Sequence, residues 1–393
     1  MKLLFLANRV PYPPYRGDKL KIYNLARRLS QRHELHLLTF AQSEEDLGYR
    51  DELLKIFKEV HLVYLPKWKS AMNCLAGAWR SEPLQVLYFR SGALQQKLDD
   101  LLAQHTYDGI HVQHLRMSPY LKDRKDLPRI LDLPDAFSLY WERRKTVKRG
   151  LLTTIFENIE QKRVLRYEKV LEQYDLSLVC SAEDLAYLQQ THKTNNLRLL
   201  PNGVDLETFA CRDHDYGHNH TLLFTGNMDY APNVDAVVYF TESILPLIRV
   251  KHPRVKFIIA GQRPVPKVQE LANDYIQVTG FVKDLAATYN AASVVVAPLR
   301  FGAGTQNKVL EAMAIGIPVV CSHIGFGGLG IQSGEGAIMQ TDATGFAQSV
   351  ISLLDSEDLR YTTGTQGRNI IATRFDWDII AKTLEGYFEQ LSK

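Results

Sequence analysis

The 393-residue sequence has little cysteine: its only four, Cys74, Cys180, Cys211 and Cys321, lie far apart without paired spacing. Disulfide frameworks and zinc sites use closely grouped cysteines, so the sequence predicts neither and fits a reducing cytosol. No apolar run approaches the roughly 18 residues of a membrane-spanning helix. The run at residues 3–7 is too short for a signal peptide and reads as a buried first strand. We therefore expect a cytoplasmic protein.

A strong net charge is also missing, since 47 lysines and arginines stand against 44 aspartates and glutamates. The near balance and the lack of a nucleic-acid-reading motif predict no nucleic-acid partner. The charges are nevertheless uneven, because residues 1–204 carry a net +8 and the remaining residues a net −5. Two interpretations stay open: chance scatter between two domains, or a basic first half that faces an anionic acceptor or lipid surface.

Short apolar runs that read as strands recur along the whole chain, separated by helical patterns. In the first half they are residues 3–7, 35–40, 60–65, 109–112, 129–133 and 176–181. In the second half they are residues 221–225, 255–260, 276–279, 294–297 and 319–322. This alternation predicts an α/β protein with two doubly wound parallel sheets, each with its own core.

We place the first domain at residues 1–205, the second at residues 206–375 and a C-terminal helix at residues 376–393. The hinge is expected in the polar stretch 206–220. An Asn-Gly pair at Asn202 and Gly203 predicts a tight turn just before it.

Residues 298–320 are the most informative segment, because they read as strand end, glycine-rich loop, helix, turn and next strand. Gly302 and Gly304 allow the backbone to pass close to a ligand. The first turn of the following helix offers unpaired N–H groups and a positive dipole end, where phosphate binds well.

Three side chains in this segment add chemistry to the loop. Arg300 and Lys308 bring positive charge beside the expected phosphate position. Glu311, one turn into the helix, can accept hydrogen bonds from sugar hydroxyls. A strand–loop–helix unit with one glutamate can also be plain packing, but the whole string is far more specific.

The segment resembles the donor-site signature of the family-four retaining glycosyltransferases, which have the GT-B fold. In that family a Glu–seven residues–Glu pattern runs into Ala-Met-Ala-x-Gly-x-Pro-Val-Val, and Glu311 matches the second glutamate, which implies contact with the ribose. The first glutamate corresponds to Ala303, and the chain fits the Gly-x-Gly-Thr-x-x-Lys-x-Leu-Glu form of some branches. Residues 201–209 match the family's Pro-Asn-Gly-Val-Asp-x-x-x-Phe linker motif.

The resemblance covers nearly the full length and implies two Rossmann-like domains that face a deep interdomain cleft. It implies that the first domain binds the acceptor, that the second binds the nucleotide sugar, and that the C-terminal helix crosses back to the first domain. It implies a nucleotide sugar as substrate, no cofactor and no metal. The donor-binding positions that it assigns are Arg16, Gly17, Gly226, Asn227, Asn233, Gly280, Phe281, Val282, Gly302, Gly304, Thr305, Gln306, Asn307 and Glu311. Asn227 and Asn233 stand where the family has Arg and Lys, so we expect Arg300 and Lys308 to supply the lost charge.

In the first domain, the resemblance implies that Asp132 or His114 contacts the donor sugar, because many family members have a histidine at about the position of Asp132. Both residues follow or end a predicted strand, and strand carboxyl ends face the ligand in doubly wound sheets. For Asp135 and Ser138, helix capping is the better interpretation. The predicted catalytic set is therefore Asp132, His114, Arg300, Lys308 and Glu311.

Two basic segments of the first domain carry neighbouring aromatic residues. Residues 143–149 contain five cations beside Trp141, and residues 67–79 contain Lys67, Trp68, Lys69 and Trp79. A solvated face is the alternative interpretation. We expect the two segments to rest on anionic lipid at the inner face of the plasma membrane.

The implied activity is metal-independent retaining transfer of a hexose from a UDP- or GDP-linked donor to a glycan or polyprenyl-diphosphate-linked acceptor. Residues 298–308 and 132–138 resemble the branch of bacterial exopolysaccharide assembly and PEP-CTERM protein sorting. Two alternatives stay open. One is a nucleotide-sugar epimerase of the same fold, and the other is a non-catalytic relative that binds the nucleotide sugar.

Overall fold

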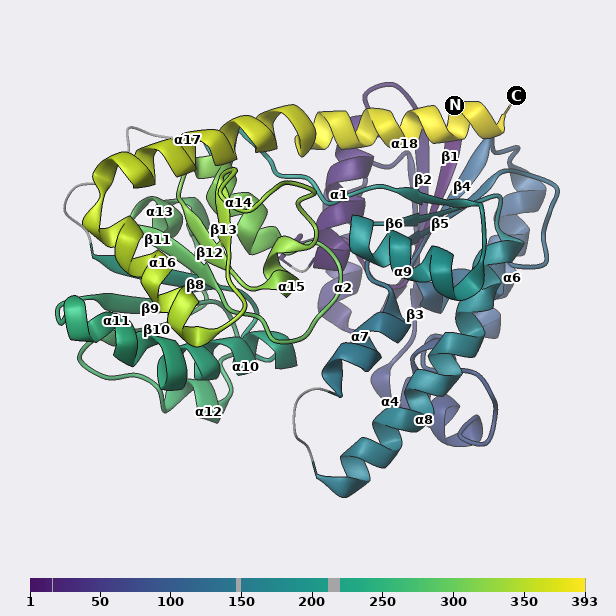
Figure 1. The fold of residues 1–393 in the computed structure, drawn as a ribbon. Helices are drawn as coiled ribbons and strands as arrows, with labels where there is room; N and C mark the ends of the chain where they lie inside the picture. The colour runs from purple at the N-terminus through teal and green to yellow at the C-terminus, as the bar shows by residue number, and fades with distance from the viewer. Residues whose placement is uncertain (16, 146–149, 211–219, 393) are drawn as a thin grey trace. The chain divides into compact units, whose positions relative to one another are not determined.

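The computed structural model describes residues 1–15, 17–145, 150–210 and 220–392. It divides into two compact units (Figure 1). The first consists of Met1–Pro201 together with Trp377–Lys393, and the second of Asn202–Asp376. Each unit has one parallel sheet with helices on both faces, so the two predicted doubly wound sheets are confirmed.

The first unit has a seven-stranded sheet within its described residues. In spatial order the strands are β3 (Glu59–Tyr64), β2 (Glu34–Ala41), β1 (Lys2–Ala7), β4 (Gly109–Gln113), β5 (Arg129–Leu133), β6 (Leu176–Val179) and β7 (Leu197–Leu199). The helices are α1 (Gly17–Leu29), α2 (Glu44–Gly48), α3 (Arg50–Leu53), α4 (Lys67–Ala76), α5 (Leu84–Leu87), α6 (Gly92–Gln104), η1 (Leu115–Tyr120), α7 (Phe137–Arg144), α8 (Leu151–Tyr167), η2 (Glu168–Gln173), α9 (Ala182–His192) and α18 (Trp377–Leu391). The strand order reverses between β1 and β4, whose residues Leu3–Leu6 and Gly109–Val112 pair in register.

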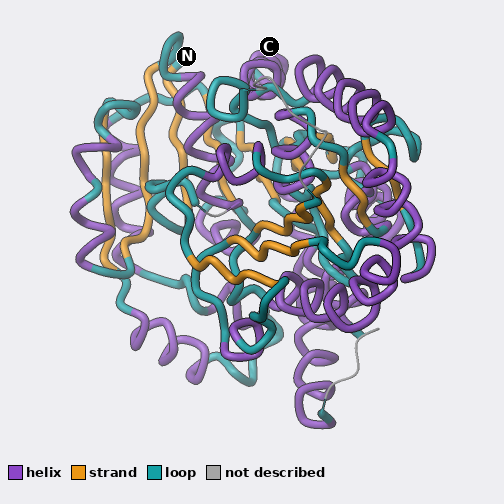
Figure 2. Tube along the Cα trace, turned by 90° about the vertical axis from the view of Figure 1, so that its left-hand side faces the viewer, coloured by secondary structure: helices purple, strands orange, loops and turns teal. Residues whose placement is uncertain are grey.

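The second unit has a six-stranded sheet within its described residues. Its order is β10 (Ile276–Gly280), β9 (Lys256–Ala260), β8 (Thr221–Thr225), β11 (Val294–Ala297), β12 (Val319–Cys321) and β13 (Ala337–Met339). The helices are α10 (Ala231–Tyr239), the π-helical η3 (Phe240–Ile244), α11 (Leu245–Lys251), α12 (Pro266–Gln269), α13 (Leu285–Asn290), α14 (Asn307–Ile315), α15 (His323–Phe326), α16 (Ala343–Asp355) and α17 (Glu357–Arg374). The strands lie between layers of helices (Figure 2).

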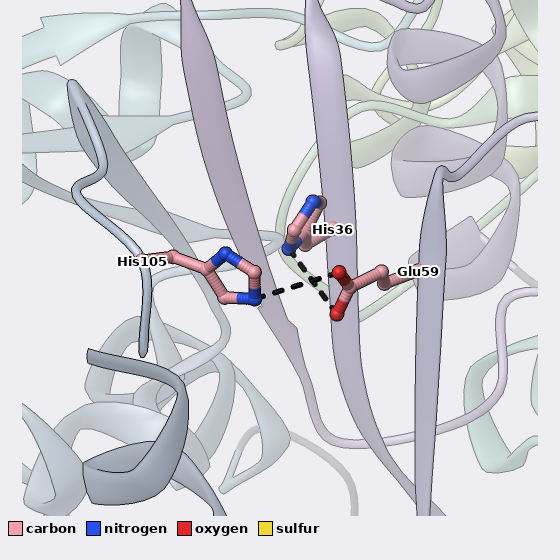
Figure 3. Close-up of side chains that lie close together, drawn as sticks. All are labelled: His36, Glu59 and His105. Atoms are coloured by element: carbon pink, nitrogen blue, oxygen red, sulfur yellow. Dashed lines mark ion pairs between the residues drawn. The ribbon is translucent and has the colours of Figure 1, made fainter. Parts of the chain in front are cut away.

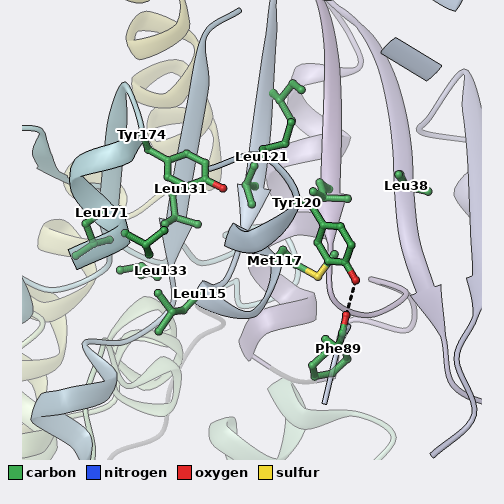
Figure 4. Close-up of a cluster of buried hydrophobic side chains, with 14 of the residues drawn as sticks. Leu38, Phe89, Leu115, Met117, Tyr120, Leu121, Leu131, Leu133, Leu171 and Tyr174 are labelled. Atoms are coloured by element: carbon green, nitrogen blue, oxygen red, sulfur yellow. Dashed lines mark hydrogen bonds between the residues drawn. The ribbon is translucent and has the colours of Figure 1, made fainter. Parts of the chain in front are cut away.

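Alternation along each strand feeds two cores, one on each face of the sheet. In the first unit, Leu4 and Leu6 belong to the cluster drawn in Figure 4, where the hydroxyl of Tyr120 donates to the carbonyl of Phe89 at 2.6 Å. Leu3 and Phe5 pack on the opposite face. Because both faces are covered, the central strands read as continuous apolar runs, which is why the sequence pattern located them.

The chain enters the second unit after Pro201 rather than after Asp205. Val204 bridges Asp376, and its N–H donates to the carbonyl of Phe375 at 2.7 Å. The predicted linker motif therefore belongs to the body of the second unit. Of the expected hinge, residues 206–210 and 220 also lie in this unit, and residues 211–219 lie outside the described part.

The terminal helix α18 belongs to the first unit, where it packs against α1. Glu385 forms ion pairs with Arg32 at 2.7 Å and His33 at 2.6 Å. Phe388 is fully buried, and a Cβ placed on Gly109 would lie 2.6 Å from its ring. Only glycine at position 109 leaves room for this aromatic ring over the start of β4.

We expect Phe388→Ala to lower the free energy of unfolding of the first unit by about 3–5 kcal/mol, because it removes a fully buried aromatic ring. Urea unfolding followed by circular dichroism measures the change. Glu389→Ala is the matched control, since Glu389 is the exposed neighbour on the same helix. Equal effects of the two substitutions would contradict the packing of α18 on the sheet.

Candidate functional site

The candidate site of the second unit lies where the strand order reverses, at the carboxyl ends of β8 and β11. Residues 226–227 follow β8, and the glycine-rich loop 298–306 follows β11 and leads into α14. The crevice at such a reversal is where doubly wound sheets bind ligands. The structure thus brings together two segments that the sequence analysis singled out separately.

Glycines allow these loops to approach one another. Gly226 has φ +154°, and a Cβ there would lie 2.5 Å from Nδ2 of Asn233. Gly302 and Gly304 have φ of 144° and 74°, conformations that favour glycine. The conformations of Gly302 and Gly304 therefore agree with the predicted close approach of their backbone to a ligand.

Glu311 sits in a short chain of hydrogen bonds. Its Oε2 accepts from the hydroxyl of Tyr289 at 2.9 Å, and that hydroxyl lies 2.6 Å from Oγ1 of Thr225. Burial raises the pKa of Glu311, while the hydrogen bond from Tyr289 and the charge of Lys308 act in the opposite direction. Tyr289 was missed by the sequence reasoning, because a tyrosine within an apolar helical pattern reads as core.

Lys308 is only 8% exposed, and its ammonium group contacts two amide oxygens. Its Nζ donates to Oδ1 of Asn233 at 3.2 Å and Oε1 of Gln306 at 3.3 Å, and it lies 5.2 Å from the ring centre of Phe224. Burial lowers the pKa of Lys308 to about 8. No carboxylate among the described residues forms an ion pair with it. Such a buried ammonium is suited to an anionic ligand.

Arg300, the second predicted cation, is held elsewhere. Its guanidinium binds Asp235 through two hydrogen bonds, of 2.8 and 2.5 Å, and stacks 4.7 Å from the ring centre of Tyr239. Both partners belong to α10. Arg300 therefore forms a structural ion pair. Of the two predicted cations, Lys308 is the one that is buried beside the loop.

The two asparagines at the positions of the missing cations form a polar network. Nδ2 of Asn233 donates to the carbonyl of Asn227 at 3.0 Å, and Nε2 of Gln262 donates to Oδ1 of Asn227 at 2.8 Å. Because Asn233 also accepts from Lys308, it holds the ammonium at the loop. Gln262 had only a weak signal in the sequence, as one residue of a strand-end turn.

The remaining predicted donor residues of the second unit surround this network. Asn307 accepts from Nδ2 of Asn202 at 2.9 Å, and Thr305 is buried. Gly280, with φ +69°, ends β10, while Phe281 is exposed and Val282 packs on the core. Donor binding by these three residues stays a prediction.

The structure places the carboxylate of Asp132 inside the first unit. Its carboxylate is 1% exposed and pairs with Nζ of Lys21 at 2.6 Å and Nε2 of His111 at 3.1 Å. Both oxygens are therefore occupied inside the core. The physical reason is that Asp132 lies within β5, where the alternation turns its side chain toward α1 instead of the strand end.

His114 follows β4 next to the reversal of strand order in the first unit. It has φ 80°, which is strained for histidine, and its ring lies 4.6 Å from that of Phe137. Burial, followed by the charges of Arg116 and Arg9, lowers the pKa of His114 well below its usual value, so its imidazole is neutral. Strained backbone of this kind gathers at functional sites.

The first loop of the chain is described only in part. Gly17, a predicted donor-binding residue, begins α1, whereas Arg16 lies outside the described residues. At the end of β5, Asp135 lies beside Cys180 and Asp184, and burial together with the charges of Asp184 and Asp18 raises its pKa to about 8.

His36, Glu59 and His105 also cluster in the first unit (Figure 3). Glu59 lies 3.7 Å from Nδ1 of His36 and 3.4 Å from Nε2 of His105. The same Nδ1 of His36 lies 2.9 Å from the hydroxyl of Tyr107, and Nδ1 of His105 accepts from Lys2 at 2.9 Å. Since the protein itself supplies these partners, we interpret the cluster as an ion-pair network. It lies toward the amino ends of the strands, whereas His114 follows the carboxyl end of β4.

Comparison with known proteins gives a family match in the second unit. Residues 219–356 match the family described as glycosyl transferases group 1. An uncharacterized 44.6 kDa protein in the cps region of Klebsiella pneumoniae is 24% identical over 369 residues, covering 89% of this chain and 90% of that protein. The phosphatidyl-myo-inositol mannosyltransferase of Mycobacterium leprae is 26% identical over 203 residues, 49% of this chain and 53% of that protein.

Solved structures share the fold over the whole chain. Sucrose-phosphate synthase from Thermosynechococcus elongatus superposes with a TM-score of 0.76 at 17% identity, covering 100% of this chain and 99% of that one. Anabaena Alr3699/HepE in complex with UDP-glucose gives a TM-score of 0.69 at 15% identity and full coverage of both chains. The predicted GT-B fold is confirmed, and residues 219–356 of the second unit are similar to the family described as glycosyl transferases group 1.

Proposed function

We propose that this chain is a glycosyltransferase that moves a hexose from a nucleoside-diphosphate donor to a glycan or a polyprenyl-diphosphate-linked acceptor, with retention of configuration. The observation that carries the proposal is the buried Lys308 ammonium, held by amide oxygens beside Glu311 at the start of α14. A diphosphate supplies the negative charge that this position lacks, and a ribose supplies hydroxyl donors for the carboxylate.

In this proposal, these residues stabilise the leaving group of the transfer reaction. Negative charge grows on the diphosphate as its bond to the anomeric carbon breaks. The ammonium of Lys308 and the amino end of α14 both favour that charge. Because these groups can act without a metal ion, the proposal includes metal-independent transfer. In the first unit, the neutral His114 is our candidate for contact with the donor sugar.

Relatives support a role in exopolysaccharide synthesis. The Klebsiella protein lies in a cps region, and this likeness covers nearly the full length of both chains. The Anabaena protein of the same fold binds UDP-glucose, which makes a UDP-linked donor our first choice and a GDP-linked donor our second. An epimerase would convert the donor without acceptor, and a non-catalytic relative would bind the donor without transfer or hydrolysis.

Thermal unfolding with UDP, GDP and ADP identifies the donor class. A nucleotide at about 100 times its dissociation constant adds about 2.7 kcal/mol to the stability of the protein that binds it. We expect one nucleotide to raise the midpoint and Glu311→Ala to abolish that rise. Glu270→Ala is the matched control, because Glu270 is exposed in the same unit. A failure of all three nucleotides to shift the midpoint would count against the donor site.

The charge of Lys308 predicts a pH dependence of nucleotide affinity. Lys308 is charged below its pKa of about 8 and neutral above it, so the affinity should fall as the pH rises through that value. Loss of one charged hydrogen bond of about 1.5–3 kcal/mol corresponds to roughly a 10- to 150-fold weaker affinity. We expect Lys308→Met to show this loss at pH 7 and no further fall at higher pH.

Calorimetric titration with the nucleotide measures both effects. Arg300→Ala is the comparison, since the structure commits Arg300 to Asp235, and it should weaken nucleotide affinity far less than Lys308→Met. If Arg300→Ala proves the more damaging of the two, the assignment of the phosphate charge to Lys308 is wrong.

A further inference from the structure

Large apolar side chains are exposed on two helical segments of the first unit. Among the described residues, nine of 20 exposed large apolar side chains lie there. They are Trp68, Met72, Leu75, Trp79, Leu151, Leu152, Ile155, Phe156 and Ile159. Single exposed apolar residues are ordinary, but a group of this kind marks an interaction surface.

The first half of helix α8 exposes apolar side chains and buries carboxylates, the reverse of an ordinary surface helix. Its buried residues include Glu157 and Glu160, whereas Leu151, Leu152, Ile155, Phe156 and Ile159 face outward. Glu157 accepts from Arg144 at 2.6 Å. Glu160 accepts from Arg163 at 2.8 Å and from the backbone N–H of Leu84 at 2.9 Å. The carboxylates are thus satisfied by the protein, and the apolar face is turned away from it.

Helix α4 and the residues after it repeat the feature. Trp68, Met72, Leu75 and Trp79 recur at helical spacing and are exposed, with Trp79 at 80%. Ser70 is the buried residue of this helix. A helix whose apolar stripe faces solvent lacks the covering layer that stabilises an ordinary surface helix.

The two segments belong to the same part of the first unit. Figure 1 shows α4 and α8 at the same end of it, and Arg163 of α8 donates to the carbonyl of Ala78, just after α4. Helix α4 follows the carboxyl end of β3, and α7 and α8 follow that of β5. Both helices therefore lie toward the carboxyl ends of the strands, the end of the sheet at which His114 also lies.

Cations surround the apolar side chains. Lys67, Lys69, Arg80, Lys145 and Lys162 are exposed on or next to these segments. Glu142 is an exposed carboxylate nearby, and its Oε2 accepts from Tyr187. An apolar stripe with lysine and arginine at its margins complements a bilayer with anionic headgroups, because the stripe enters the acyl boundary and the cations stay at the phosphates.

We propose that α4, Trp79 and the outward face of α8 form a monotopic docking surface for an anionic lipid membrane. Within the described residues, none of the helices combines the length and the apolar character that crossing a bilayer requires. If the proposed function holds, the surface brings the acceptor side of the first unit to a lipid-linked acceptor. The docking itself depends only on the residues of the first unit.

The structure also changes which of the predicted cations belong to this surface. Arg143 pairs with Glu183 and Arg144 with Glu157, so these two cations are engaged inside the unit. Residues 146–149 lie outside the described part of the chain. The apolar face of α8, not the basic run before it, is therefore the main element of the proposal.

Flotation of the full-length protein with vesicles tests the docking surface. We expect binding to vesicles of phosphatidylcholine mixed with phosphatidylglycerol and much weaker binding to phosphatidylcholine alone. Leu152→Ser with Phe156→Ser should weaken binding at least about tenfold, because two apolar side chains no longer enter the bilayer. The matched control is Leu247→Ser with Val250→Ser, two exposed apolar residues of the second unit, which should leave binding unchanged.

Tryptophan fluorescence gives an independent readout. The chain has four tryptophans, of which Trp68 and Trp79 are exposed on the surface. Anionic vesicles should shift the emission to the blue, and Trp68→Phe with Trp79→Phe should abolish the shift. The nucleotide-induced rise in unfolding midpoint should be the same in the Leu152/Phe156 variant as in the wild type, which separates failure of docking from failure of the donor site.

The proposal would be overturned if the protein did not bind anionic vesicles, or if the Leu152/Phe156 variant bound them as well as the wild type does. It would also be overturned if the wild type formed dimers in analytical ultracentrifugation and the Leu152/Phe156 variant were monomeric. The last outcome would assign the surface to a second copy of this chain.

Discussion

The parallel pairing of β8 with β11 is the constraint on which the candidate donor site depends. Leu222 and Leu223 pair with Val294 and Val295, although some 70 residues separate the strands in the sequence. Parallel neighbours must be joined by crossover connections, and here the connections leave β8 and β11 in opposite directions. Their carboxyl ends are therefore open to a ligand, and the loops after them meet.

The fold could be read from the sequence because its central strands are buried on both faces. Their continuous apolar runs, separated by helical patterns, predicted both sheets. The domain boundary could not be placed to the residue, because the hydrogen bond of Val204 to Phe375 joins positions far apart in the sequence. The tight turn predicted at Asn202 and Gly203 is wrong, since these residues form no turn and Gly203 lacks the positive φ that such a turn needs.

The candidate site was predictable where chemistry is local and unpredictable where it depends on distant partners. The glycine-rich loop, Lys308 and Glu311 lie in one segment, whose pattern named them. Arg300 has the same local context as Lys308, and only the fold shows that Asp235 holds it. In the same way, the pattern did not show that the side chain of Asp132 faces Lys21 in the core.

The inverted helix α8 shows a different limit of pattern reading. A helical sequence pattern does not say which side chains of the helix the protein covers. Buried carboxylates are costly unless paired, and here Arg144 and Arg163 pair them, so the polar face can turn inward. The inward turn leaves the apolar side chains outside.

In the proposed donor site, the buried Lys308 is the cation that would hold the diphosphate. An ammonium buried among amide oxygens is costly to keep charged, and its lowered pKa expresses that cost. A diphosphate beside it would restore the balance, so part of the binding free energy comes from relieving the unliganded site. Asn233 accepts a hydrogen bond from the ammonium, and the carbonyl of Asn227 in turn accepts from Asn233, so neither asparagine adds charge of its own. One well-placed cation in a low-dielectric pocket can thus replace several exposed ones, because its interaction with the anion is screened less by water.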